Sequence, residues 1–346
     1  MTQTPTQPQA SPPGPAKAGP GTARRAVGRV GAQNLGLIVA LAAVVTLFGV
    51  LNPAYLAPAN LAVIGQTVTI VGLLAVVETV VIICGALDIS VGSQTGLASV
   101  TSAMIFMATG HSALIGIAGA LAIGVAVGVL NGVIIVYGRV NSVIATLAGL
   151  AAYKGVAQVI SGGRAQGYTL GNDIFIFIAR GSIAGIPTMV WILALVAAGI
   201  LHVLLKYTDI GRNIYAIGGN DTAARLAGIN INKYLIAVYA LSGFVAAIAG
   251  IILSARTGSG QPVSGSEGLE LQAITAAALG GCALAGGKGN VGGTLLAVLL
   301  LGALENGLNI VGVNTFWQNV AQGALLVTAV MIQQRRSGER AVGLPR

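Results

Sequence analysis

Long apolar runs separated by short polar gaps are the dominant pattern of the chain. A transmembrane helix needs about 20 predominantly apolar residues to cross the hydrocarbon core of a bilayer. Ten runs of this kind are predicted, at 35–51, 63–84, 90–109, 113–137, 142–160, 187–206, 234–254, 268–286, 290–308 and 316–333. The predicted fold is therefore an all-α polytopic membrane protein with about ten transmembrane helices.

Two of these segments carry polar residues and glycine where a continuous span would be apolar. They begin near Ile89 and Gly268. Irregular backbone at membrane depth is tolerated where it is buried in protein or lines a cavity, and transporters use broken helices of this kind. We therefore expect one or two broken or re-entrant helices.

Composition supports the membrane assignment. Hydrophobic residues make up 55% of the 346 residues and charged residues only 8%, against about a quarter charged in an ordinary soluble domain. The net charge of +9 does not indicate a nucleic-acid partner, because the cations lie in short gaps between apolar runs. The bilayer is the expected environment, and no nucleic acid is expected.

Cysteine and histidine give no sign of a metal, a cofactor or a catalytic centre. Cys84 and Cys282 both lie within apolar runs and are expected to be small core residues. His111 and His202 have no acidic neighbour in sequence, and no metal-ligand or triad spacing is present. The chain is not expected to be an enzyme.

The distribution of basic residues predicts the orientation. With the amino terminus in the cytoplasm, fourteen Lys and Arg residues fall on the cytoplasmic side and three outside, while Lys154 stays within a span. Cytoplasmic loops are enriched in these residues, so both termini are predicted to be cytoplasmic. We expect a disordered proline-rich tail at 1–34, a transmembrane domain at 35–334 with a cytoplasmic loop at 207–233, and a basic tail at 335–346.

A ridge of small residues runs along the fourth predicted span. Its members recur at every fourth position: Gly116, Ala120, Gly124, Gly128 and Gly132. Small residues at this spacing allow a neighbouring helix backbone to approach closely. We interpret the ridge as a helix-packing surface.

Acidic residues at membrane depth are candidates for function, because each costs about 2.5–3.5 kcal/mol on insertion scales. Glu78 lies mid-span, where Gln66 or a hydroxyl group on another helix could be its partner; a structural hydrogen bond and a role in the solute pathway both remain open. Asp88 and Ser90 lie in the glycine-bracketed segment GALDISVGS. That segment can cap a helix and can also form a binding or gating site.

A third acidic residue, Glu305, begins a polar strip in the ninth predicted span. Asn306 and Asn309 continue the strip, and Glu305 and Asn309 share one helix face. The strip could line a pathway for a hydroxyl-rich solute or could hold helices together. Both interpretations are open at this stage.

The cytoplasmic segment GRNIYAIGGNDTAARLAGI, residues 211–229, has the pattern of a short exposed helix. Asn220 or Asp221 can cap its start, and Gly228 is a typical stop signal. Ala223, Leu226 and Ala227 fall on one side. Such a helix is either a docking element or an interfacial helix that rests on lipid headgroups.

The run GGCALAGGKGN around Lys288 superficially suggests a phosphate-binding loop. The pattern fails because Cys282 stands where the first glycine belongs and Gly289 where Ser or Thr belongs. The run also follows an apolar span instead of a strand. If ATP drives the protein, we therefore expect the ATP-binding site to lie in another subunit.

Four ordered motifs resemble the ribose-type permeases of bacterial ATP-binding cassette uptake systems. They are NPAYLAPANL at 52–61, AVVETVVIICGALDISVGS at 75–93, the segment at 211–229 and ALGGCALAGGKGNVGGTLLAVLLLGALENGLNIVGV at 278–313. The resemblance covers nearly the whole chain after residue 50. Ala86 and Ile89 stand where the family more usually has Gly and Leu.

The resemblance implies a permease subunit of an ATP-driven importer in the bacterial inner membrane. It implies a second permease copy or paralogue, a periplasmic or lipid-anchored solute-binding protein, a cytoplasmic ATPase subunit, and a monosaccharide or similar polar solute carried by alternating access. The 211–229 segment would then be the coupling helix. The residues expected to contact the ATPase are Gly211, Arg212, Gly218, Asn220, Ala223, Ala224, Leu226 and Gly228.

An ion-coupled secondary transporter is the alternative, with Glu78 or Asp88 as the ion site. It would need no ATPase, and the patterned cytoplasmic helix argues against it.

Overall fold

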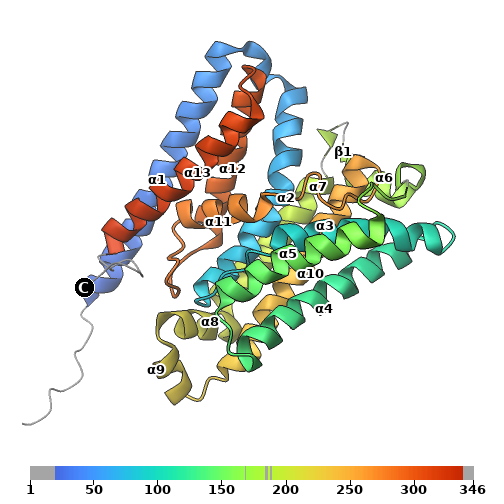
Figure 1. Ribbon diagram of the computed structural model, residues 1–346. Helices are drawn as coiled ribbons and strands as arrows, with labels where there is room; N and C mark the ends of the chain where they lie inside the picture. Colours follow the sequence, from blue (N-terminus) through green and yellow to red (C-terminus); the bar gives the residue numbers. More distant parts are fainter. Residues whose placement is uncertain (1–19, 168, 184–185, 188, 338–346) are drawn as a thin grey trace, which may run out of the picture.

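The computed structural model describes residues 20–337, except for residues 168, 184–185 and 188 (Figure 1). Within them the chain is helical apart from its connections and one antiparallel pair of two-residue strands, β1 (Ser182–Ile183) and β2 (Ile186–Pro187). The all-α prediction is confirmed.

The helices follow the predicted segments closely. In order they are α1 (Pro20–Leu51), η1 (Pro53–Leu56), α2 (Pro58–Ile83), α3 (Val91–Ala108), α4 (Ala113–Tyr137), α5 (Ser142–Ser161), η2 (Thr169–Gly171), α6 (Asp173–Arg180), α7 (Met189–Tyr207), α8 (Asp209–Gly219), α9 (Asp221–Leu226), α10 (Ile231–Thr257), α11 (Leu269–Leu279), α12 (Val291–Ile310) and α13 (Thr315–Ser337).

Asparagine side chains define the starts of several helices. The side-chain oxygens of Asn141, Asn230 and Asn290 accept hydrogen bonds from backbone N–H groups in the first turns of α5, α10 and α12. The first N–H groups of a helix have no intrahelical partner, and an asparagine cap satisfies one of them. Asparagines in the short gaps thus set where α5, α10 and α12 begin.

The central helix is α2. Every residue from Thr69 to Ile83 is buried, because α7, α10, α11 and α12 pack around it. Figure 1 shows α1, α12 and α13 on one side of α2, and α3, α4, α5 and α10 on the other. The buried half of α2 therefore joins two groups of helices.

The predicted small-residue ridge of α4 lies in the interface with α10. Gly124 contacts the backbone of Gly243, and Gly128 contacts the backbone carbonyl of Tyr239. A side chain at either position would force the two helices apart, since the backbones meet there without intervening atoms. The interpretation of the ridge as a packing surface is confirmed.

Seven helices of the described residues are long and apolar enough to cross a membrane. They are α1, α2, α4, α5, α7, α10 and α12. The two segments predicted to be broken, α3 and α11, are not among them; α11 has only 11 residues, about 16 Å of helix against a hydrocarbon core of about 30 Å. The prediction of one or two broken or re-entrant helices agrees with this short α11.

The amino-terminal helix α1 begins before the predicted span. The apolar part begins near Asn34, close to the predicted start at 35, whereas α1 itself begins at Pro20, within the segment expected to be a disordered tail. Residues 1–19 and 338–346 lie outside the described residues, and α13 runs past the predicted boundary at 334 to Ser337.

Candidate functional site

The break between α2 and α3 is the first candidate region. The chain leaves α2 at Cys84 and turns at Gly85, whose φ of +87° favours glycine. The backbone N–H of Asp88 then donates to Glu78 Oε1 at 3.1 Å. A carboxylate on α2 thus closes the turn that follows the helix.

The carboxylate of Asp88 is saturated with hydrogen bonds. Oδ1 accepts from the backbone N–H and the hydroxyl of Ser90, at 3.0 and 2.5 Å. Oδ2 accepts from Ser242 Oγ on α10 at 2.7 Å and from Gln94 Nε2 on α3 at 3.3 Å. Such bonds compensate the cost of burying a carboxylate. Asp88 therefore fixes the turn that precedes α3 by accepting from Ser90. The predicted cap is not formed, because no side chain accepts from the N–H groups of the first turn of α3 among the described residues.

A second layer of bonds ties this break to α4 and α5. Ser90 Oγ accepts from Asn131 Nδ2 of α4 at 2.9 Å, and Tyr153 of α5 donates to Asn131 Oδ1 at 2.6 Å. Tyr239 of α10 donates to the carbonyl of Leu87 at 2.9 Å. We call Asp88, Ser90, Gln94, Asn131, Tyr153 and Ser242 the Asp88 network. It joins four helices at one point.

The Asp88 network is closed to solvent. The exposed fractions of Glu78, Asp88 and Ser90 are all 0%. Within the described residues, Glu78 Oε2 has no hydrogen-bond partner. The three predicted residues do come together, and all three are fully buried.

The suggested pairing of Glu78 with Gln66 is wrong. Both residues lie on α2, separated by twelve positions, which is about 18 Å of helix rise. Among the described residues, the hydrogen bond of Gln66 outside its own helix is made by its backbone carbonyl, which accepts from Arg256 Nη1 of α10 at 2.9 Å. Gln66 belongs to the opposite end of the helix.

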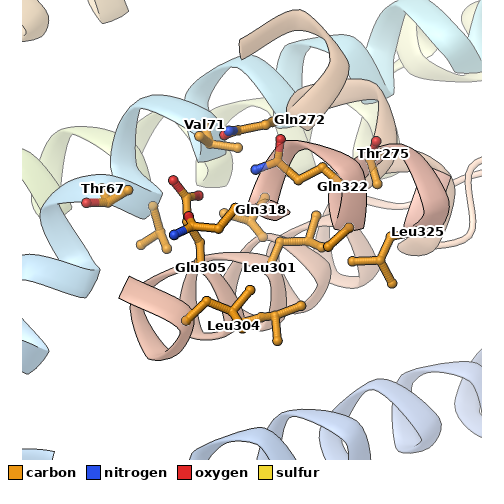
Figure 2. A pocket seen from close by; sticks show the side chains of 15 residues that line it. Thr67, Val71, Gln272, Thr275, Leu301, Leu304, Glu305, Gln318, Gln322 and Leu325 are labelled. Atoms are coloured by element: carbon orange, nitrogen blue, oxygen red, sulfur yellow. The ribbon is translucent and has the colours of Figure 1, made fainter. Parts of the chain in front are cut away.

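A cleft between α2, α11, α12 and α13 is the second candidate region (Figure 2). Glu305 of α12 and the side chains of Gln272, Gln318 and Gln322 project toward one space in this cleft, with Thr67 and Thr275 at its borders. Within the described residues, no hydrogen bond or ion pair engages the carboxylate of Glu305. We call this region the Glu305 cleft. Its amides, hydroxyls and carboxylate can donate and accept hydrogen bonds.

The two asparagines predicted to extend the polar strip hold helices together. Asn306 and Asn60 exchange side-chain hydrogen bonds at 2.8 and 3.0 Å, which tie α12 to the start of α2. Asn309 Oδ1 accepts from Gln318 Nε2 of α13 at 2.8 Å. Of the three predicted residues, Glu305 alone lines the cleft.

The segment at 211–229, predicted to be cytoplasmic, contains the short helix that its pattern predicts. Asn220 caps α9 by accepting from the N–H of Ala223 at 2.9 Å, and Gly228 follows the helix with a φ of +84°. Ala224 is buried, whereas Leu226 is 86% exposed. An exposed leucine at the tip of a capped helix fits a docking element.

The preceding helix α8 was not foreseen and connects α9 to the membrane core. Its first part contains Gly211 and Arg212, which pairs with Asp209. At its end, Gly218 lies against the backbone of Ile83 and Gly287, and the N–H of Gly287 donates to the carbonyl of Ile83 at 2.9 Å. The glycines before Lys288 thus allow the loop backbone to pack closely against α8 and the end of α2. This role agrees with the rejection of a phosphate-binding loop.

The described residues contain no group of three or more His, Cys, Asp or Glu side chains that could hold a metal ion. The candidate site consists of hydrogen-bonding groups and the exposed helix α9.

Comparison with known proteins adds three findings. The family model described as "Branched-chain amino acid transport system / permease component" matches residues 60–330. The chain is 40% identical over 301 residues to the ribose import permease protein of Escherichia coli (strain K12), covering 86% of this chain and 93% of that protein. It is 39% identical over 313 residues to the ribose import permease protein of Bacillus subtilis (strain 168), covering 88% and 94%.

A relative named for a different sugar is similar over almost the full length. The L-arabinose ABC transporter permease protein of Azospirillum brasilense is 35% identical over 337 residues, covering 96% of this chain and 97% of that protein. The similarity therefore includes the Asp88 network, the Glu305 cleft and the α8–α9 segment.

Proposed function

The chain belongs to the family of permease components described for branched-chain amino acid transport systems, and from this premise we propose that its solute is a monosaccharide or a similar polyol. It is a multi-pass inner-membrane permease subunit of an ATP-binding cassette importer, so its activity is transport. ATP hydrolysis belongs to a separate ATPase subunit, and a solute-binding protein delivers the solute.

One observation carries the proposal of a sugar. Relatives that are 35–40% identical to this chain over 86–96% of its length are named as ribose and L-arabinose permeases. The polar groups of the Glu305 cleft agree with a neutral, hydroxyl-rich solute, because amides can donate to and accept from hydroxyl groups, whereas a carboxylate accepts from them. The family description alone would indicate branched-chain amino acids. Apolar side chains such as Val71, Leu301 and Leu325 also line the cleft, so the choice of a sugar rests on the names of the relatives.

The pathway of the solute is proposed to follow the Glu305 cleft. The half-helix α11 contributes Gln272 and Thr275 to the cleft, and discontinuous helices commonly form transporter sites. Asp88, Ser90 and Glu78 have a structural role in this proposal, because the network that contains Asp88 is closed. Gln66, Asn306 and Asn309 support the surrounding helices.

Coupling to the ATPase is proposed to occur through α9. Leu226 and Ala223 form its exposed apolar side, while Gly218 of α8 contacts both the end of α2 and the 280–290 loop. Movement of α9 would therefore reach the core through α8. A second permease copy or paralogue completes the proposed assembly, with both termini in the cytoplasm as the distribution of basic residues favours.

The ion-coupled alternative has less support. Both oxygens of the Asp88 carboxylate already accept hydrogen bonds from protein groups. A coupling cation at this position would have to displace them. The alternative remains an outcome of the experiment that follows.

The experiment is uptake of labelled solutes by vesicles that hold the permease with its ATPase and binding protein. We expect ATP-dependent uptake of ribose, arabinose or xylose, and none of leucine or valine, which serve as matched controls. Uptake of leucine instead would overturn the proposed solute class. Uptake driven by an ion gradient without the ATPase would overturn the importer.

A further inference from the structure

Lys154 is a charged residue inside a span that the proposed function does not explain. It lies twelve positions after the first residue of α5 and seven before the last, which is about 18 and 10 Å of helix rise. Its side chain is 38% exposed. Gln158, one turn further along α5, is also exposed. The exposed face of α5 thus carries polar groups at membrane depth.

The partner of Lys154 lies on the segment that leads into the half-helix α11. Lys154 Nζ and Glu267 Oε1 are 2.7 Å apart, and the Glu267 side chain is 66% exposed. Residues 258–268, between α10 and α11, form no helix. An ion pair and irregular backbone therefore occur together at one exposed surface.

A second carboxylate lies close behind this pair. Glu270, in the first turn of α11, is 7% exposed. Its Oε2 atom approaches Gly92 of α3 and has no hydrogen-bond partner among the described residues. The surface around Lys154 is thus backed by a buried polar group that lacks a protein partner.

Lipid cannot cover this surface at low cost. A charge at the centre of a span costs about 2.5–3.5 kcal/mol on insertion scales, so such residues face water-filled cavities or protein. Several N–H groups of the irregular 258–268 backbone donate within the protein, including those of Gly260 and Glu267. The charges of Lys154 and Glu267 are therefore what disfavours lipid contact at this place.

We propose that Lys154 and Glu267 line the aqueous solute pathway and bind the hydroxyl groups of the transported sugar directly. The inference rests on the proposed function and extends its pathway from the Glu305 cleft, which Gln272 and Thr275 of α11 line, to the segment just before α11. The ammonium donates and the carboxylate accepts, so the pair can bind two neighbouring hydroxyls. Because the two charges cancel, the site favours a neutral solute.

Thiol accessibility in the complete importer tests whether water reaches Lys154. The variant Lys154→Cys is treated with a membrane-impermeant charged thiol reagent, with and without ribose, arabinose or xylose. Leu195→Cys on α7 is the matched control: Leu195 is 64% exposed and lies about 9 Å of helix rise from the start of α7. The native cysteines are both buried.

We expect Lys154→Cys to react at least about tenfold faster than Leu195→Cys, because the thiolate forms only in water, and we expect a transported sugar to slow the reaction. Equal, slow reaction of the two variants, with and without ATP, would overturn the inference. So would fast reaction that no transported solute slows. If the reaction is fast and only leucine slows it, Lys154 lies in the solute pathway, but the proposed function is wrong about the sugar.

Uptake kinetics separate solute contact from a structural role. For Lys154→Met and Glu267→Gln we expect KM to rise about tenfold or more, since charged hydrogen bonds to the solute are lost. The amount of folded importer should not change. A loss of folded protein with unchanged KM would show that the pair only joins α5 to the 258–268 segment.

Discussion

The Asp88 network and the Glu305 cleft place the same chemical group, a carboxylate in a membrane protein, in opposite surroundings. Asp88 is fully buried and accepts bonds from Ser90, Gln94 and Ser242. Glu305 is partly buried and lines a cleft among amide side chains. A saturated carboxylate fixes helices, whereas an unsatisfied one remains available for a solute.

The two regions also show two kinds of polar residue in this apolar chain: residues whose hydrogen bonds are made within the protein, and residues that line a cleft. Around Asp88 the donors come from α3 and α10 and leave no free position on the carboxylate. Near Glu305, helices α12 and α13 are joined by a hydrogen bond from the Gln318 side chain to Asn309 Oδ1. This bond does not involve Glu305, which lines the cleft. Of the two carboxylates compared, only that of Glu305, which has no hydrogen bond among the described residues, lines a cleft.

The largest expected effect comes from Asp88→Ala. The change leaves the N–H and hydroxyl of Ser90 and the hydroxyl of Ser242 buried without an acceptor, which we expect to lower the free energy of unfolding by about 3–5 kcal/mol. The thermal unfolding midpoint of purified protein in detergent measures it. Glu305→Ala is the matched control and should cost less than about 1 kcal/mol. If Asp88→Ala and Glu305→Ala lower the free energy of unfolding equally, the contrast between a structural Asp88 and an unbonded Glu305 is wrong.

A smaller effect is expected from Tyr153→Phe, at the outer layer of the Asp88 network. The change removes the donor to Asn131 Oδ1 and should cost about 0.6–1.7 kcal/mol, the range of hydrogen bonds between membrane helices. Tyr137→Phe, at an exposed tyrosine of α4, controls for the loss of a hydroxyl. If both variants unfold at the same temperature as the wild type, the network does not extend to α5.

The smallest effect on stability is expected from Glu305→Gln. The side chain keeps its size and has no hydrogen bond to lose among the described residues, so the free energy of unfolding should change by less than about 0.5 kcal/mol. The KM for uptake should rise several-fold, because a neutral amide is a weaker acceptor for hydroxyl groups. Unchanged KM would remove Glu305 from the solute pathway.

The parts of the fold that depend on residues close together in the sequence could be predicted from local sequence signals. The cap at Asn220 and the stop at Gly228 lie within one short segment, so α9 followed from its own pattern. The break after α2 also followed from nearby residues, since Gly85 and Gly92 bracket Asp88. Span positions depended only on runs of apolar residues.

The partners of the polar residues could not be predicted from one sequence. Ser242 and Asn131 reach the α2–α3 break from helices that are distant in the chain, and Glu267 reaches Lys154 across more than a hundred positions. Nothing in the local pattern distinguishes Gln94, which completes the network, from Gln66, which does not. The suggested pair of Glu78 and Gln66 failed because both lie on the same helix.

ATP-dependent sugar uptake by a Leu226→Asp variant tests most directly whether this permease is driven through α9. The added charge lies on the exposed apolar side of α9, whereas Asn232→Asp places the same charge on an exposed position at the start of α10. We predict loss of at least about nine-tenths of the uptake in Leu226→Asp, with the permease folded, and near wild-type uptake in Asn232→Asp. Full uptake by Leu226→Asp would contradict coupling through α9.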